Sequence, residues 1–434
     1  MVRSKLLADL VRGSLGVLLP GVSAASIFAL SASALAAPVA ARATPNPLMA
    51  AALAARAGHL KLLESVVNID SGTGDADGGR KVIAVLVPRL KALGASVETV
   101  PAEAPGLPEN VVATVRGTGK TRILMIGHID TVFGPGTVAQ RPFKIDGDAM
   151  TGRAMGPGVG DEKGGVVEGI IALELLRAAK FTDFASITLL IETSEERGSP
   201  GTRKLIDRLL DTADVELNLE PGDAPDKVTV WRKGSTVFTI DVTGKAAHAG
   251  VAPQDGRNAA VELLHQLEAY DKFPHTGDGL TVNLTLLSAG TRNNIIPDHA
   301  TATFSVRARG APQNDAVERQ LLATAAKVAV PGTTVTIHHE PAFPPLPENP
   351  ATAALAARAK VIYAGVGRTL TTGGNGGASE SAMAAARGVP ALDGLGPVGG
   401  GFHSDGEYIE LNTLTPRLYL LAALLKDLGA KGVH

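Results

Sequence analysis

Apolar residues recur at helical spacing in two stretches early in the chain, and shorter apolar runs follow them. Residues 45–67 and 78–93 place leucine, valine and alanine every three or four positions, which predicts two helices. Residues 165–179 repeat this pattern between two of the shorter runs. Because helices and strands alternate, we expect an α/β domain with a sheet flanked by helices. The predicted strands are residues 97–100, 110–115, 122–126 and 186–192, of which the last two are apolar enough to be buried on both faces.

The order of elements changes near residue 227. Strands and helices follow there in the order β-α-β-β-α-β, which characterises ferredoxin-like domains. We therefore predict a discontinuous α/β domain, residues 44–226 and 341–434, interrupted by an inserted α+β domain, residues 227–340. The elements predicted in the insertion are a long strand 228–242, a helix 258–270, strands 280–288 and 300–309, a helix 314–329 and a strand 333–338; the helices predicted after it are 349–364, 379–386 and 413–428.

The first residues of the chain have the pattern of an export signal. Basic residues precede an apolar run over residues 15–35, and the run ends in an Ala-Leu-Ala motif at 34–36, a typical cleavage site. An uncleaved membrane anchor is the alternative, since the run is almost long enough to span a bilayer. Pro20 and Gly21 in its middle favour cleavage. We expect residues 1–36 to be a signal peptide and the mature protein to be periplasmic or secreted, without stable membrane insertion.

Composition narrows the possible chemistry. The chain has 434 residues, more than a single compact core usually holds, which agrees with two domains. Lysine and arginine number 41 against 43 aspartates and glutamates, so we expect no nucleic-acid partner. The chain has no cysteine, which excludes thiol nucleophiles and cysteine-ligated zinc. Any metal must therefore be held by histidine and carboxylate side chains.

Histidine and carboxylate residues gather where predicted strands end or where glycine-rich loops begin. In an open α/β sheet these positions meet at one edge and collect ligands. Taken alone, each residue could have no functional role. A His-x-Asp pair occurs often by chance, and His403 could be an ordinary loop residue. Glu195 and Glu196 could be exposed residues at the start of a helix, where negative charge is favourable. Their joint order along the chain favours a metal site. The candidates are His128, Asp130, Asp161, Glu195, Glu196, Glu220 and His403.

Six short motifs contain or flank these residues. They are Gly-His-Ile-Asp-Thr-Val at 127–132, Gly-Pro-Gly-Val-Gly-Asp-Glu-Lys-Gly-Gly at 156–165, Glu-Glu-Arg-Gly-Ser at 195–199, Thr-Gly-Lys-Ala-Ala-His-Ala-Gly at 243–250, Asn-Asn-Ile-Ile-Pro at 293–297 and Phe-His-Ser-Asp at 402–405. In sequence and order they resemble the motifs of the carboxypeptidase-G and aminoacylase family of dizinc metallopeptidases, most closely its glutamate carboxypeptidase branch. The resemblance spans about residues 46–432.

The resemblance implies a role for each candidate residue. Asp161 would bridge two zinc ions, or other divalent metals, and the peptide bond after it would be cis. Glu195 would be the general base that takes a proton from the attacking water. Asp130 would accept the second imidazole N–H of His128 and fix its tautomer. The remaining ligands would be His128 and Glu220 for one metal, and Glu196 and His403 for the other.

The resemblance also implies contacts with substrate and partner, most of them in the inserted domain, which would act as a lid and pair two subunits in a homodimer. His248 would stabilise the oxyanion in the partner's active site; from the residues alone, a loop histidine that caps a turn is the alternative. Arg307 would bind the carboxylate of the substrate's C-terminal residue, because a guanidinium offers a carboxylate two parallel hydrogen bonds. Asn294, and Gly377 in a glycine-rich loop near the end of the chain, would contact the same part of the substrate.

The sequence departs from the pattern of glutamate-releasing relatives in two places. Glu340 precedes Pro-Ala-Phe at 341–343 where those relatives carry arginine, and Ser379-Glu380 replaces their Thr-Asp. A carboxylate in place of a cation repels an acidic substrate side chain unless another base compensates. The candidate replacements are Lys227, Arg232 and Lys233.

The predicted function is a zinc-dependent exopeptidase, a metallocarboxypeptidase that acts on small peptides or N-acyl amino acids. It would release a C-terminal amino acid, glutamate or aspartate first, by metal-activated water with Glu195 as base. One alternative is a deacylase or dipeptidase that releases a neutral residue, which Glu340 leaves open. An alternative of another class is an exported, non-catalytic peptide-binding protein, which would need no base beside a metal site.

Overall fold

The computed structural model describes residues 46–433. The predicted signal peptide, residues 1–36, lies outside the described residues. Within residues 46–433, no helix is both long enough and apolar enough to cross a lipid bilayer. The described chain forms sheets of six, seven, four and two strands with flanking helices, which is an α/β architecture.

The six-stranded sheet contains the strands predicted in the first part of the chain. Its order is β1-β2-β6-β3-β7-β17, in which β6, β3, β7 and β17 run parallel and β1 and β2 run antiparallel to their neighbours. All but the first residue of β3 are buried, as its apolar sequence predicts. The strands are β1 (Ser96–Val100), β2 (Asn110–Arg116), β3 (Arg122–His128), β6 (Ser186–Glu192), β7 (Val215–Asn218) and β17 (Ala391–Leu392).

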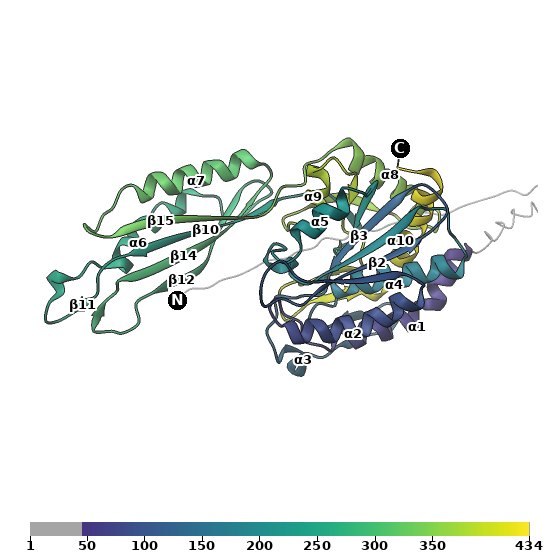
Figure 1. Ribbon diagram of the computed structural model, residues 1–434, viewed down its shortest axis with the longest axis horizontal. Helices are drawn as coiled ribbons and strands as arrows, with labels where there is room; N and C mark the ends of the chain where they lie inside the picture. The colour runs from purple at the N-terminus through teal and green to yellow at the C-terminus, as the bar shows by residue number, and fades with distance from the viewer. Residues whose placement is uncertain (1–45, 434) are drawn as a thin grey trace, which may run out of the picture. The chain divides into compact units, whose positions relative to one another are not determined.

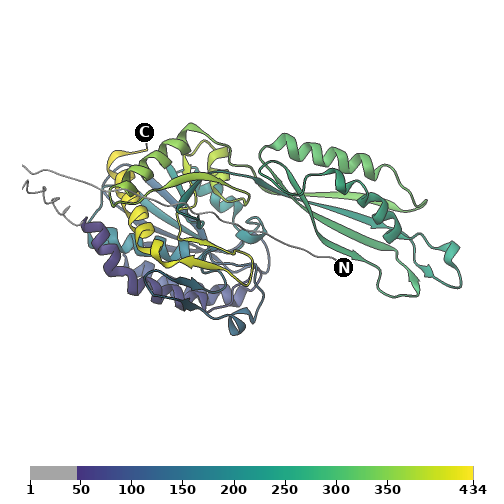
Figure 2. The ribbon, with the colours of Figure 1, turned by 180° about the vertical axis from the view of Figure 1, so that it is seen from behind.

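Helices cover both faces of this sheet (Figure 1 and, from behind, Figure 2). Ile123 and Met125 of β3 belong to a core shared with α1, α2, α4, α8 and α10. Leu124 and Ile126 belong to a second core, shared with α5 and α9. Alternate residues of one strand thus serve two cores, which is why β3 needs a continuous apolar run. The helices are α1 (Pro47–Val67), α2 (Ala76–Ala92), α3 (Thr137–Gln140), α4 (Lys163–Ala178), α5 (Arg203–Leu210), α8 (Pro350–Ala364), α9 (Ser381–Ala386) and α10 (Leu411–Lys431).

The seven-stranded sheet is absent from the sequence-based prediction. Its order is β16-β9-β8-β18-β19-β5-β4. Most of its strands have two or three residues, too few for a periodic pattern to distinguish them from loops. The strands are β4 (Lys144–Asp146), β5 (Arg153–Met155), β8 (Gly222–Asp223), β9 (Lys227–Arg232), β16 (Thr371–Asn375), β18 (Val398–Gly400) and β19 (Tyr408–Glu410).

The segment predicted as an inserted domain, which keeps that name below, has the predicted β-α-β-β-α-β order, in an antiparallel sheet ordered β12-β14-β10-β15. Phe238, Ile240 and Val242 of β10 share one core with residues of α6 and α7, so both helices lie on the same face of the sheet. The other face carries the alternate, more polar residues. The elements are β10 (Gly234–Thr243), α6 (Ala259–Leu267), β12 (Thr281–Ala289), β14 (His299–Ala308), α7 (Ala311–Ala325) and β15 (Thr334–Phe343), with a small ribbon of β11 (Ala247–His248) and β13 (Ile295–Ile296).

The long strand predicted at 228–242 is two strands. β9 ends at Arg232 and belongs to the seven-stranded sheet, whereas β10 begins at Gly234 and belongs to the inserted domain. A Cβ atom at Gly234 would lie 2.7 Å from the backbone nitrogen of Pro345, where the chain returns from the insertion. Glycine is needed there because the two connections pass close together. The change of sheet falls a few residues after the predicted boundary at 226/227.

Candidate active site

The candidate ligands meet at one edge of the six-stranded sheet because parallel strands end there. β3 ends at His128, which is paired with Glu192 at the end of β6. Glu195 and Glu196 come three and four residues after the end of β6, and Glu220 comes two residues after the end of β7. These residues therefore reach the same edge as His128. It is the edge at which α/β sheets normally bind their ligands.

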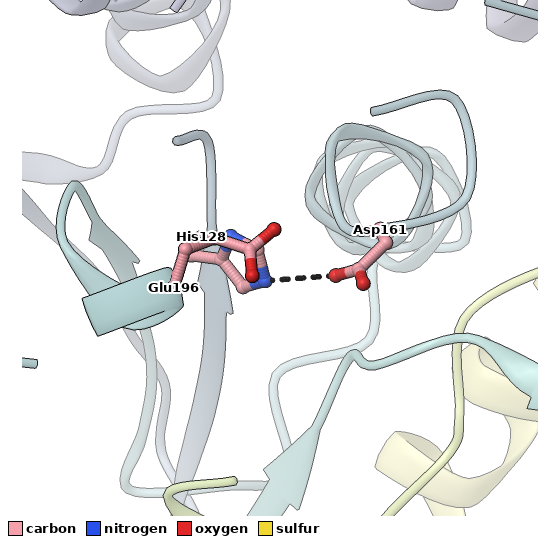
Figure 3. A group of neighbouring side chains, drawn as sticks. All are labelled: His128, Asp161 and Glu196. Atoms are coloured by element: carbon pink, nitrogen blue, oxygen red, sulfur yellow. Dashed lines mark hydrogen bonds and ion pairs between the residues drawn. The ribbon is translucent and has the colours of Figure 1, made fainter. Parts of the chain in front are cut away.

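Asp161 lies between the two histidines of the site, with one carboxylate oxygen toward each. Its Oδ1 is 3.1 Å from Nε2 of His128, and its Oδ2 is 3.2 Å from Nε2 of His403. Each imidazole also faces a glutamate: Nε2 of His128 is 3.5 Å from Oε1 of Glu220, and Nε2 of His403 is 3.1 Å from Oε2 of Glu196. Figure 3 shows the bond from His128 to Asp161, with Glu196 nearby. The arrangement is two half-sites that share one aspartate.

The turn that carries Asp161 is held by a carboxylate from another part of the chain. Glu407 accepts hydrogen bonds from the backbone N–H groups of Gly158, Gly160 and Asp161 at 3.0, 2.9 and 3.1 Å. Because Glu407 lies in the loop that also carries His403, it ties the two ligand-bearing loops together. The peptide bond after Asp161 is cis, as the resemblance implies. The sequence does not single out Glu407, although its nearness to His403 could have indicated it.

Asp130 lies beside His128, but its carboxylate has further partners. Nδ1 of His128 is 3.0 Å from the backbone oxygen of Asp130 and 3.5 Å from its carboxylate Oδ1. The carboxylate accepts hydrogen bonds from the backbone N–H groups of Glu195 and Glu196 at 3.1 and 3.3 Å. It also accepts one from the hydroxyl of Thr73 at 2.6 Å. Asp130 therefore orients the imidazole through its carbonyl and holds the glutamate pair through its carboxylate.

Glu195 lies beside His128 but farther from it than Asp161 does. Its Oε2 is 3.8 Å from Nε2 of His128, and its side chain is buried. Burial raises the pKa of Glu195 well above its usual value, opposed by the charge of His128 and reinforced by the carboxylates of Glu380 and Glu220. A carboxylate with a raised pKa accepts a proton more readily, which favours a role as the base in general acid–base catalysis.

The site concentrates negative charge. Burial opposes the ionisation of Asp161, yet hydrogen bonds from His128 and His403 outweigh it and hold the pKa of that carboxyl below its usual range. Hydrogen bonds to Asp161 and Glu196 raise the pKa of His403 to about 10. Burial raises the pKa of Glu220 to about 7. Carboxylates gathered in this way are stabilised by bound cations.

Two groups of ligand atoms are close enough together to hold a cation, and both include His128. One adds Asp161 and Glu196, and the other adds Glu162 and Glu220. Glu162 was not predicted; its Oε2 lies 3.6 Å from Nε2 of His128, and its Oε1 has no hydrogen-bond partner among the described residues. A set of imidazole nitrogens and carboxylate oxygens with an unpaired buried oxygen fits divalent metal ions.

A cavity of about 570 Å³ joins the ligands to predicted substrate contacts. Arg307 and Gly377 line it, and so does Glu340. Arg307 of β14 pairs with Ser235 of β10. Glu340 of β15 pairs with Val237 of the same strand. Arg307 and Glu340 are therefore on one face of the sheet with β10 between them, two strand spacings across and two residues along the strand, or about 12 Å apart.

The other two predicted contacts, His248 and Asn294, do not line this cavity. Both are exposed at the β11–β13 ribbon, where the N–H of Ala249 donates to the carbonyl of Asn294 at 3.0 Å. Nδ1 of His248 accepts hydrogen bonds from the N–H groups of Gly250 and Val251, both at 3.1 Å. Within one chain, His248 therefore caps a turn.

The cations considered as replacements for the missing arginine are engaged elsewhere. Arg232 lines the cavity, but its guanidinium binds two carboxylates, those of Asp393 and Glu220. Lys233 donates to a backbone carbonyl at 2.5 Å, and Lys227 pairs with a carboxylate at 2.9 Å. Of the three cations only Arg232 lines the cavity, and each has a partner among the described residues, so the expected replacement stays a prediction that the structure does not support.

Comparison with known proteins identifies the family. Residues 124–427 match the family described as Peptidase family M20/M25/M40. The chain belongs to this family. Carboxypeptidase G2 from Pseudomonas sp. (strain RS-16) is 35% identical to this M20 peptidase over 415 residues, which cover 95% of this chain and 99% of that protein.

Solved structures share the fold of this M20 peptidase. A tripeptidase from Staphylococcus aureus has a TM-score of 0.71 at 21% identity, covering 87% of this chain and 99% of that one. A dinuclear metal-binding M20 peptidase from Bacillus subtilis has a TM-score of 0.60 at 16% identity, with coverage of 87% and 99%. The protein is therefore a peptidase-type hydrolase, and the non-catalytic alternative is set aside.

Ser379 and Glu380, which depart from the pattern of the relatives, lie behind the site and do not form part of the cavity wall of this M20 peptidase. Both residues are buried. Ser379 donates to Asp393 at 2.5 Å, and Glu380 accepts hydrogen bonds from Ser199 at 3.4 Å and Asn218 at 3.0 Å. The replacement at these two positions therefore affects residues that support the metal ligands, and it does not alter the surface that lines the cavity.

A second cavity, of about 700 Å³, adjoins the first. Glu196 and Arg197 line both. The walls of the second cavity include two loops, residues 72–75 and 131–135, which a backbone hydrogen bond of 3.0 Å from Thr73 to Thr131 joins. Phe133 supplies an aromatic wall. A substrate that crosses the ligands therefore has space on either side of Glu196.

Proposed function

We propose that this M20 peptidase is a zinc-dependent exopeptidase that hydrolyses the amide bond between an acyl or aminoacyl group and a C-terminal amino acid. The observation that carries the proposal is the position of Asp161 between His128 and His403, with Arg307 in the same cavity. The first feature suits two cations, and the second suits the free carboxylate of a C-terminal residue.

Each side chain of the site has a separate role in the proposed reaction. When bound, two zinc ions lower the pKa of water and polarise the scissile carbonyl. Glu195 takes a proton from the attacking water and delivers it to the leaving amino nitrogen. Asp130 fixes Glu195 by holding its backbone N–H. Arg307 orients the substrate through its carboxylate. The residues that would hold the metals are His128, Asp161, Glu196, Glu220 and His403.

Glutamate or aspartate is the first candidate for the released residue, on the strength of the resemblance to glutamate carboxypeptidases. Glu340 favours a second candidate, a neutral residue released by a deacylase or dipeptidase. It lies about 12 Å from Arg307 on the same face of the sheet, a distance that a bound amino-acid side chain can partly bridge. A carboxylate there repels an acidic side chain.

The second cavity is our proposed site for the acyl or N-terminal part of the substrate. It adjoins the first cavity at Glu196 and Arg197, so a substrate whose carboxylate is at Arg307 can extend across the ligands into it. Phe133 favours apolar or aromatic acyl groups, because a ring offers a large contact area.

We propose that the enzyme is a homodimer paired through the inserted domain, in which His248 reaches the partner's active site. Support comes from the edge strand β12, whose Leu286 and Leu287 are 67% and 58% exposed. Apolar residues on a sheet edge suit isologous pairing.

Complementation tests this dimer. Glu195→Gln and His248→Ala should each be nearly inactive. A reassembled equal mixture should recover about one quarter of wild-type turnover, because half of the dimers are mixed and each has one complete site. A mixture no more active than its parents contradicts the shared site.

A substrate panel that varies only the C-terminal residue tests the proposed function. Zinc-loaded protein is given N-benzoyl dipeptides ending in Glu, Asp, Gln, Leu or Lys, and the matching C-terminal amides. We expect release of the C-terminal residue from free acids and little from amides, because amides lack the carboxylate for Arg307. Release from none of the panel refutes the proposal, and the ranking of Glu against Gln decides between the two candidate classes.

Export is proposed from the sequence pattern alone. If residues 1–36 are a signal peptide, the protein recovered outside the cytoplasm begins at Ala37. Intact mass of the recovered protein checks this, and a full-length mass in that fraction contradicts cleavage.

A further inference from the structure

A buried arginine contacts the ligand cluster from outside it. Arg232, the last residue of β9, is 3% exposed, and its Nη2 lies 3.3 Å from Oε2 of Glu220. The other oxygen of the same carboxylate, Oε1, is the one that lies 3.5 Å from Nε2 of His128. The two oxygens of Glu220 therefore face different partners, one toward the ligands and one toward Arg232.

Asp393 holds the guanidinium of Arg232 in place. Nε and Nη2 bind its two carboxylate oxygens at 2.7 and 2.5 Å. Asp393 is itself fully buried and accepts hydrogen bonds from the hydroxyls of Ser379 and Ser381, both at 2.5 Å. A guanidinium bound through two parallel hydrogen bonds has a fixed plane and direction. The N–H group that faces Glu220 is thus oriented by contacts that involve no metal ligand.

The backbone of Arg232 is fixed as well. Its N–H donates to the carbonyl of Leu346 at 2.9 Å, and its carbonyl accepts from the N–H of Leu346 at 3.1 Å. Arg232 is on the connection that enters the inserted domain, and Leu346 is on the connection that leaves it. Side chain and backbone therefore both restrict where the guanidinium can be.

We propose that Arg232 is a positioning residue for the metal site: it holds Oε2 of Glu220, so that Oε1 stays directed toward His128, with which it would hold a metal. A carboxylate held in this way does not have to lose its rotational freedom when the metal binds. Hydrogen-bond partners of metal ligands typically contribute about 10–100-fold to metal affinity. The inference rests on the metal site of the proposed function, but not on the substrate.

A purely structural role is the competing explanation, because a buried arginine paired with aspartate also stabilises the fold. Arg417 on α10 offers a matched control. It is fully buried, its Nη1 lies 3.4 Å from Asp226, and its Nε donates to a backbone carbonyl at 2.9 Å. Its described hydrogen bonds and ion pairs include no predicted metal ligand.

The test compares Arg232→Met, Arg232→Lys and Arg417→Met with the wild-type full chain. Each protein is stripped of metal, and zinc affinity is measured by competition with a chromophoric chelator, beside thermal unfolding of the metal-free form. We expect Arg232→Met to weaken one of two zinc sites by about 10–100-fold and to leave the other unchanged. Arg232→Lys, which keeps the charge but not the fork, should weaken the same site less. Arg417→Met should lower the unfolding temperature without changing zinc affinity.

Two results overturn the inference: wild-type affinity at both sites in Arg232→Met, or an equal loss of affinity in Arg417→Met. If Arg232→Met does not fold, Arg232→Lys decides, and wild-type affinity in that variant contradicts a positioning role. Because zinc binding is read without substrate, failure of the wild-type enzyme to release any amino acid refutes the proposed function separately.

Discussion

The two ends of the cavity are built in different ways. At the ligand end, side chains are fixed from outside the cavity: Asp130 holds the glutamate pair, and Glu407 holds the turn of Asp161. At the other end, Arg307 and Glu340 project from one face of the inserted domain's sheet. The ligand end has little freedom to change without losing its geometry. At the far end, the one with Arg307 and Glu340, single side chains can be replaced without disturbing the metal ligands. We therefore expect these residues to determine substrate specificity.

Replacing Arg307 should have the largest effect at the far end. Arg307→Ala removes two charge-assisted hydrogen bonds to the substrate's carboxylate, worth about 3 kcal/mol, and so lowers kcat/KM about 100-fold. Metal content should not change. Arg309→Ala is the matched control, because that guanidinium stacks on Trp231 at 3.6 Å and does not line the cavity. Steady-state kinetics check this, and equal losses in both variants would mean that Arg307 acts through the fold.

Reversing the charge at Glu340 should have a smaller effect, confined to the released side chain. Glu340→Arg should raise the ratio of kcat/KM for C-terminal Glu over C-terminal Gln about 10-fold, since one repulsive charge becomes attractive. Glu340→Gln should raise it by less. The same substrate pair measures both variants. An unchanged ratio would show that the released side chain does not approach this position.

Shortening Phe133 should have the smallest effect, on the acyl side. Phe133→Ala should raise KM a few-fold for an N-benzoyl substrate, because part of the ring's apolar contact is lost. KM for the N-acetyl substrate with the same C-terminal residue should stay near wild type. Equal changes for both substrates would place the acyl group elsewhere.

Much of the ligand end could be predicted from sequence, because the ligands follow strands whose apolar runs are unmistakable. β3 is buried on both faces, and its end fixes the place of His128. Asp130 was predicted as a support of His128, but Glu407 and Asp393 were not predicted. They act through contacts between segments far apart in the chain, and only the nearness of Glu407 to His403 gave a local signal. Arg232 was considered only as a free cation, since its pairing with two carboxylates depends on the fold.

In the inserted domain, too, some features could be predicted from the sequence and others could not. The order of its strands and helices follows from hydrophobic periodicity, and the structure confirms it. The break at Gly234 was missed, because an alternating pattern continues through it and the reason for the break is the returning chain at Pro345. His248 does not line the cavity of its own chain. Its predicted role therefore depends on a second subunit, which a single sequence does not describe.

Glu195→Gln tests the central claim most directly, when zinc content and turnover are measured on the same preparation. The claim is that Glu195 moves protons beside a metal pair that other residues hold. The variant should therefore bind two zinc ions per chain with wild-type affinity and hydrolyse the best panel substrate about 1,000-fold more slowly. Turnover close to wild type would contradict the claim. Loss of zinc together with turnover would also contradict it, because Glu195 would then be a ligand and not the base.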